Sequence, residues 1–120
     1  MGNYVTPTDF FARKVKRLVK KFHTLQDSLY ELENDLIKNP FLGKKLSNNL
    51  FKVRVADESK GKGKSGGFRV ITYLINENDT SIEILLLTIY DKSEEQTIEK
   101  DEIKEIVKEV TAQRKNRQSK

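Results

Sequence analysis

The chain has 120 residues, a length typical of one domain, and 34% of them are charged. It contains no cysteine and one histidine, His23, which excludes a disulfide scaffold, a cysteine nucleophile and a metal site made from two histidines of one chain. The formal net charge of +5 is unevenly distributed. Residues 1–70 contain 15 basic and 7 acidic side chains, whereas residues 71–110 contain 4 basic and 11 acidic ones. A basic first part predicts a polyanionic partner such as a nucleic acid.

The first residues of the chain and its apolar stretches indicate where in the cell the protein is expected. No apolar stretch approaches the roughly 20 residues that cross a bilayer, and the first residues lack the basic and apolar regions of a secretory signal. We therefore expect a cytoplasmic protein with no membrane partner. We expect one domain over residues 1–112 and a basic, disordered tail over 113–120, because the tail has no apolar anchor.

Two amphipathic helices are expected near the start of the chain. Residues 8–22 and 24–37 each repeat apolar side chains at intervals of three and four, the spacing of a helix with one buried face. Thr8 or Asp9 is expected to cap the first helix, and Thr24 the second in a capping-box arrangement. The short break between them predicts a helical hairpin.

The middle of the chain has strand patterns. Residues 51–56 alternate apolar and basic side chains, which predicts a strand with Lys52 and Arg54 on its solvent-facing side. Residues 68–75 and 81–90 predict two further strands joined by a polar hairpin loop. The last of these strands is apolar on both faces, so we expect it to lie in the centre of the sheet.

The remaining segments complete the expected order. A short first strand is expected around residues 4–5 and a C-terminal helix over 100–114, whereas residues 41–50 are expected to form a loop. The predicted order is β-α-α-β-β-β-α. The fold class is α+β, with a small twisted, mainly antiparallel sheet packed on an N-terminal helical hairpin and a C-terminal helix.

A glycine- and lysine-rich segment, GKGKS, follows the first long strand. It is not a Walker nucleotide loop, because that motif needs a glycine where this chain has Glu58 and a helix where this chain predicts a strand. We expect a flexible hairpin loop that contacts RNA phosphates through three lysines: Lys60, Lys62 and Lys64.

A cationic cluster is expected where the three long strands run side by side. If they are consecutive antiparallel neighbours, five side chains converge on one surface: Lys52, Arg54, Arg69, Tyr90 and Lys92. Fixed cations can hold a phosphodiester and stabilise the extra negative charge of its transition state, and a lysine among other cations can act as a general base. The spacing by itself also leaves open a basic strand surface without chemistry.

The run GKGKSGGFRVITY, followed by LLLTIYDKSEE and EIKEIVKE, resembles the RelE/HigB-like toxins of bacterial type II toxin–antitoxin systems. The most specific part is KSGGFRVITY, from Lys64 to Tyr73, and the whole resemblance covers residues 4–110. It implies a fold similar to microbial ribonucleases. It also implies an mRNA interferase, a ribosome-dependent endoribonuclease that inhibits translation by cutting mRNA through attack of a ribose 2′-hydroxyl, with no metal and no cofactor. The implied partners are the ribosome, mRNA and a cognate antitoxin. In the HigB-like branch of the family, this antitoxin often has a helix-turn-helix domain.

The same resemblance implies roles for individual residues. Arg54 and Arg69 match the family's phosphate-binding positions, and Lys92 lies near the basic residue that helps the leaving group. Lys52 or Lys64 is our expectation for the general base.

The chain also departs from the family pattern. Classical RelE members have a tyrosine in the last helix that orients the attacking hydroxyl, and residues 100–114 contain none. Tyr90 fits instead the Tyr-x-Lys ending of the HigB-like branch, where it could stack on a base. Two other functions stay open: a toxin of the same fold that acts on another target such as DNA gyrase, and a catalytically silent module that binds RNA or the antitoxin.

Overall fold

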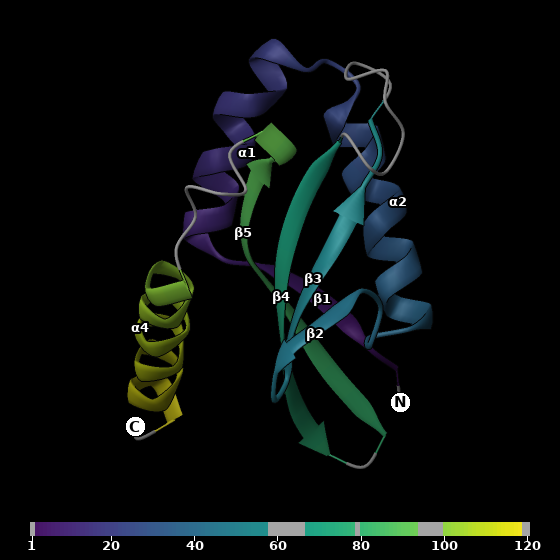
Figure 1. Cartoon of the computed structure of the whole chain (residues 1–120). Coiled ribbons are helices and arrows are strands. Elements are labelled where there is room, and N and C mark those ends of the chain that lie inside the picture. Colours follow the sequence, from purple (N-terminus) through teal and green to yellow (C-terminus); the bar gives the residue numbers. More distant parts are fainter. Residues whose placement is uncertain (1, 58–66, 79, 94–99, 119–120) are drawn as a thin grey trace.

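A computed structural model describes residues 2–57, 67–78, 80–93 and 100–118, with eight helices and strands. In chain order these are β1 (Tyr4–Pro7), α1 (Asp9–Lys21), α2 (Leu25–Lys38), β2 (Lys44–Ser47), β3 (Leu50–Val55), β4 (Phe68–Asn78), β5 (Ser81–Asp91) and α4 (Lys100–Gln118). The strands form one sheet in the order β1-β5-β4-β3-β2, where β1 is parallel to β5 and the other neighbours are antiparallel (Figure 1). The predicted α+β class is confirmed. The strand β5 is an interior strand between β1 and β4, as its apolar faces predicted, although the middle strand of the sheet is β4.

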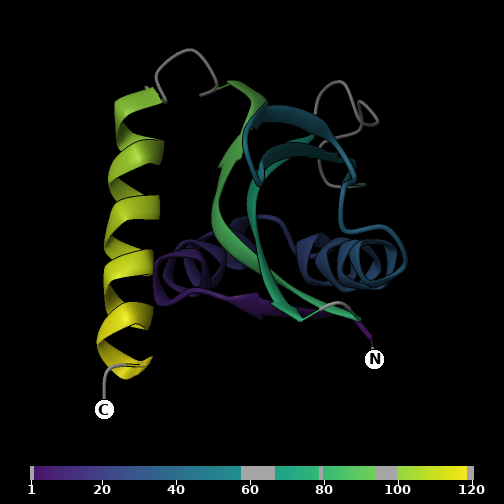
Figure 2. The same ribbon diagram turned by 90° about the horizontal axis from the view of Figure 1, so that it is seen from below.

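The helices α1 and α2 lie on the same side of the sheet (Figure 2). The predicted cap of α1 is confirmed, because Thr8 Oγ1 accepts a hydrogen bond from the Phe11 amide at 3.1 Å. The predicted capping box of α2 is wrong. Thr24 has helical backbone angles and its hydroxyl donates to the buried carboxylate of Asp57 at 2.9 Å, as Ser28 does at 2.7 Å. A buried carboxylate requires donors, so this tertiary contact displaces the local cap.

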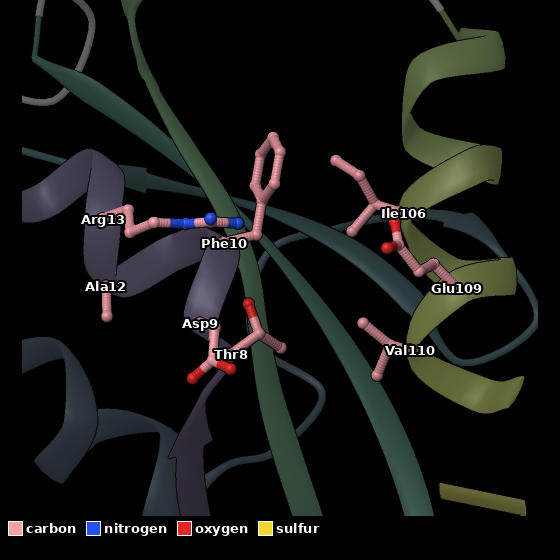
Figure 3. Close-up of a pocket in the computed structure, with 8 residues that line it drawn as sticks. All are labelled: Thr8, Asp9, Phe10, Ala12, Arg13, Ile106, Glu109 and Val110. Carbon is pink, nitrogen blue, oxygen red and sulfur yellow. The ribbon is translucent and has the colours of Figure 1, made fainter. Parts of the chain in front are cut away.

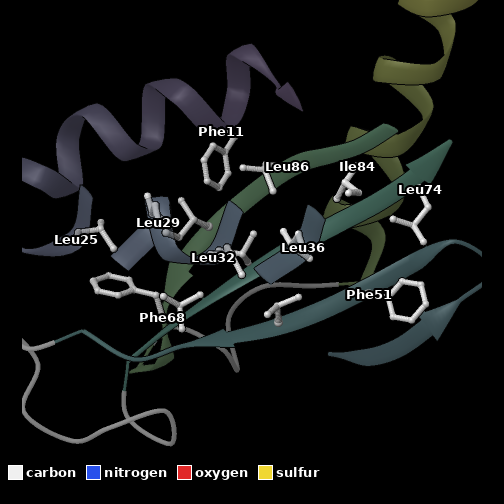
Figure 4. Close-up of a cluster of buried hydrophobic side chains, with 14 residues drawn as sticks. Phe11, Leu25, Leu29, Leu32, Leu36, Phe51, Phe68, Leu74, Ile84 and Leu86 are labelled. Atoms are coloured by element: carbon white, nitrogen blue, oxygen red, sulfur yellow. The ribbon is translucent and has the colours of Figure 1, made fainter. Parts of the chain in front are cut away.

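The main core lies between the sheet and the helices α1 and α2 (Figure 4). Leucines spaced three and four apart along α2 meet the alternate residues of β3, β4 and β5 that point to this side. The most completely buried members include Leu25, Leu36, Phe68, Val70 and Ile89. Burying side chains of this size contributes about 1.5–3 kcal/mol each, so this layer is the main source of stability.

A second apolar cluster covers part of the opposite face of the sheet. Ile103 and Ile106 of α4 pack against Ile71, Leu85 and Leu87. Figure 2 shows α4 beside the sheet, apart from α2. The face that we expected to be solvent-facing is therefore divided. Its apolar part is covered by α4, and the rest contains the basic side chains described below.

The strand β2 corrects the expected loop over residues 41–50. Its side chains are all exposed, so it has no apolar alternation that a sequence pattern could reveal. Two residues with a positive φ flank this strand. Gly43 has a positive φ of 98°, where a Cβ would collide with the Lys52 carbonyl oxygen. Asn49, in the turn to β3, has a positive φ of 65°, which asparagine tolerates better than most residues. Among the described residues, the order of the elements is therefore β-α-α-β-β-β-β-α.

The helix α4 extends to Gln118, so its backbone includes most of the segment 113–120 that we expected to be disordered. The segment has no glycine or proline and contains Gln, Arg and Lys, which favour a helix even without an apolar anchor. No helix among the described residues is both long and apolar enough to cross a membrane.

Candidate nucleic-acid interface

Two rows of side chains cross the face of the sheet that α4 covers in part, and two of their members, Ile71 and Tyr90, pack in the α4 cluster. In the first, which we call the arginine row, Arg54 of β3 is opposite Arg69 of β4, which is opposite Tyr90 of β5. In the second, the lysine row, the order from β2 to β5 is Lys44, Lys52, Ile71 and Thr88. Rows two residues apart along a strand point to the same side. The expected convergence of Lys52, Arg54, Arg69 and Tyr90 on one face is thus present.

Arg69 lies in the middle of the arginine row and is 1% exposed, whereas Arg54 beside it is exposed. One guanidinium nitrogen of Arg69 donates to the carbonyl oxygen of Phe68 at 3.2 Å. Burying a charge costs free energy unless polar groups surround it. The sequence placed only Lys52 and Arg54 on a solvent-facing side, and it gave no indication that Arg69 is buried. Arg54 presents accessible charge, and Arg69 adds charge from within the sheet.

Lys52 is half-buried and lies opposite Lys44 of the edge strand. Lys44 is exposed and was not among the candidate residues, because its segment was expected to be a loop. Like charges directly opposite each other in a sheet are destabilising. The face has two such pairs in successive rows, Lys44 with Lys52 and Arg54 with Arg69. The two pairs concentrate positive charge on this face.

Lys14 of α1 extends the lysine row beyond β5. Its Nζ donates to the hydroxyl of Thr88 at 3.2 Å and lies 5.5 Å from the ring centroid of Phe10. Phe10 packs in the same apolar cluster as α4, which places this side of α1 toward the face with the two rows. The sequence showed Lys14 only as one of many basic residues on an amphipathic helix. Its contact with Thr88 joins residues 74 positions apart.

Tyr90 lies near the end of β5, and Lys92 directly follows this strand. The ring of Tyr90 is 4% exposed and packs in the α4 cluster, so base stacking would require the ring to be uncovered. The amide of the half-buried Lys92 donates to the Gly67 carbonyl at 3.0 Å, which places it one step beyond the arginine row. A Cβ at Gly67 would collide with the Val55 carbonyl oxygen, so only glycine allows β3 and β4 to approach this closely just before Arg69.

Four other residues singled out in the sequence lie away from the two rows or outside the described residues. Lys60, Lys62 and Lys64, which we expected to bind RNA, lie outside the described residues. His23 lies exposed between α1 and α2. Among the described residues, no three His, Asp or Glu side chains gather as metal ligands would.

A separate pocket of about 400 Å³ opens between the start of α1 and α4 (Figure 3). It combines apolar side chains with charges of both signs: Phe10, Ile106 and Val110 with Asp9, Arg13 and Glu109. The mixed charge distinguishes it from the two rows, which contain no carboxylate. The rows, and not this pocket, have the electrostatic character of a polyanion site. No family model matches the chain.

Proposed function

We propose that this protein is a RelE/HigB-like toxin, a ribosome-dependent endoribonuclease that acts on mRNA in the cytoplasm and is neutralised by a cognate antitoxin. The observation that supports this best is the arginine row, with Lys52 and Lys92 on either side of it. These residues also match the family positions in the sequence. The accessible cations on this face are suited to an RNA backbone, which supplies closely spaced phosphates.

In the proposed reaction, a ribose 2′-oxygen attacks the adjacent phosphorus and the 5′-oxygen of the next nucleotide leaves. The products are a 2′,3′-cyclic phosphate and a 5′-hydroxyl, so no water or external nucleophile is consumed. The transition state has an additional negative charge on the phosphoryl oxygens. Arg54 holds these oxygens by charge-assisted hydrogen bonds, and Arg69 contributes its charge from directly beside it.

The proton transfers are assigned to the lysines. Lys52, in its neutral amine form, takes the proton of the 2′-hydroxyl and becomes an ammonium; it lies two residues from Arg54 on the same side of β3. Lys92 gives a proton to the leaving oxygen from the other side of the arginine row. Lys64, the other residue we considered for the base, lies outside the described residues.

The antitoxin is proposed to cover this face with an acidic segment, because the face is rich in cations. In the absence of the antitoxin the ribosome offers a larger polyanion, and binding to it is expected to fall steeply with salt.

The test is induction in a bacterium, with primer extension on a reporter mRNA. The wild type should arrest growth and give codon-phased cuts. Arg54→Ala should reduce cleavage about 10²–10³-fold, the usual effect of removing one transition-state donor. Because Arg54 is exposed, its truncation should leave the fold intact. Arg69 is buried, so Arg69→Lys, which keeps the charge and removes the two-pronged donor, is preferable to Arg69→Ala.

The matched control is Lys45→Ala, because Lys45 is exposed on β2 and lies opposite Phe51, on the other side of the sheet from Lys44. It should cut like the wild type. Growth arrest without cuts would contradict the proposal and favour a target such as DNA gyrase.

A silent binding module is the second candidate, because α4 lacks the tyrosine found in classical RelE members. This second candidate would be favoured if induction caused neither growth arrest nor mRNA cuts while the protein still bound RNA or the antitoxin.

A further inference from the structure

The helices α1 and α2 lie on the same side of the sheet (Figure 2), and each presents a charged stripe to the solvent. The apolar residues of α1 that pack on the main core lie on the opposite side of the helix, so its stripe points away from the sheet. This stripe is basic, and its exposed members recur at intervals of three and four residues: Arg13, Lys16, Arg17 and Lys20.

The corresponding stripe of α2 is acidic and contains an aromatic side chain. Its exposed members follow the same spacing: Asp27, Tyr30, Glu31 and Asn34. Among the described residues, Tyr30 is the most exposed large hydrophobic side chain, at 67%. Tyrosine is enriched at protein interfaces, because it buries a large ring and keeps a polar group for hydrogen bonding. A tyrosine among carboxylates is therefore suited to a basic protein surface.

We propose that this surface binds a second copy of the same chain, with α1 of each copy packed against α2 of the other. A polyanion would suit the basic stripe, but the acidic stripe on the same side of the molecule would repel it. A second copy offers both complements at once, because its own stripes supply an acidic and a basic half. A two-fold axis that runs between the helices, in the plane of the interface, makes the two contacts equivalent.

The same axis determines which side chains meet. Lys20 and Asp27 lie at the ends of their helices that are joined in the chain, so the axis brings each to the other in the second copy. Arg17 meets Tyr30 and Glu31 one turn further from this connection. An arginine guanidinium can stack on a tyrosine ring and donate hydrogen bonds to a neighbouring carboxylate. This contact occurs twice in the dimer.

The size of the surface predicts a weak dimer. The helices have 13 and 14 residues, so each presents a strip about 20 Å long and about 10 Å wide. Two such strips bury about 400 Å² on each copy, about half of what a stable interface buries. The dimer is therefore held largely by charge. It leaves the side of the sheet with the arginine row uncovered by the second copy, and it does not depend on the proposed function.

The experiment is sedimentation velocity of the full chain at about 0.05–1 mM, a range that detects micromolar to millimolar dissociation constants. At about 0.05 M salt, the sedimentation coefficient of the wild type should rise with protein concentration. At about 0.5 M salt the rise should be much smaller, because salt screens exposed charges.

Charge reversal tests the two stripes directly. Arg17→Glu and Glu31→Lys each introduce two like-charge contacts into the symmetric dimer and should raise its dissociation constant at least about tenfold. An equimolar mixture of these two variants should associate like the wild type, because each mixed dimer contains one native and one reversed pair. Tyr30→Ala should weaken the dimer about fivefold or more without changing the charge.

The matched controls are on α4, which packs on the other face of the sheet. Lys104→Glu and Glu105→Lys change exposed side chains and alter the net charge as Arg17→Glu and Glu31→Lys do. Both should stay within about twofold of the wild type. Circular dichroism should show the same fold for all variants, since every changed side chain is exposed.

Three outcomes would overturn the dimer. A wild type that stays monomeric at about 1 mM in low salt would leave the α2 stripe to a different protein, such as the antitoxin. Equal weakening in the α4 controls would assign the effect to net charge alone. A mixture of Arg17→Glu and Glu31→Lys that does not recover association would show that the two stripes do not face each other.

Discussion

The two faces of the sheet use the same three strands for different purposes. Val53, Val70 and Ile89 lie opposite one another across β3, β4 and β5, and all are buried in the main core. The residue next to each of these along its strand belongs to the arginine row, which points to the other side of the sheet. The first row gains free energy by removing apolar surface from water. The second places like charges together, which lowers stability. We infer that stability and binding are assigned to alternate residues of the same strands.

The largest expected effect is on the apolar face. Ile89→Ala should lower the free energy of unfolding by about 2–5 kcal/mol, because it removes a completely buried side chain and leaves a cavity. Urea denaturation followed by circular dichroism measures this. The control is Ile37→Ala, the same chemical change at a side chain that is 42% exposed, which should cost within about 0.5 kcal/mol. Similar costs at the two positions would contradict the assignment of stability to this face.

A smaller effect is expected at Thr8, which joins α1 to the sheet. Its hydroxyl caps α1 and also donates to the Leu86 carbonyl at 2.9 Å, so it fixes α1 against β5. Thr8→Ala should lower the free energy of unfolding by about 0.5–2 kcal/mol, as measured by urea denaturation. Thr8→Ser keeps the hydroxyl and should unfold like the wild type. Equal losses of stability in the two variants would contradict the role of the hydroxyl.

The smallest effect has the opposite sign. Arg54→Thr should raise the free energy of unfolding by about 0.2–1 kcal/mol, because it removes a like-charge pair and introduces a residue that favours strands. The same variant should lose cleavage. Arg54→Lys keeps the charge opposite Arg69 and should give no gain in stability. A loss of stability in Arg54→Thr would mean that the arginine row contributes to folding, against the comparison drawn above.

The helix α1 and the strand β3 could be predicted from the sequence because the patterns that indicate them lie within each segment. The spacing of Phe11, Val15 and Leu18 predicted α1, and the Thr8 cap was recognisable from residue type. The alternation in residues 51–56 put Lys52 and Arg54 on one side of a strand. Period two and antiparallel neighbours then sufficed to bring Arg54, Arg69 and Tyr90 into one row.

Other features depended on contacts between distant segments, which leave no local pattern. The strand β2 exists because its backbone pairs with β3, although all its side chains are exposed. Thr24 turns from its helix to Asp57, and Lys14 reaches Thr88 from another element. The burial of Arg69 is likewise a property of its surroundings. The sequence by itself determined which side chains share a strand or helix face, because backbone periodicity is local. Only the tertiary structure decided which faces are covered and which cations meet, because burial and charge proximity depend on how the elements pack.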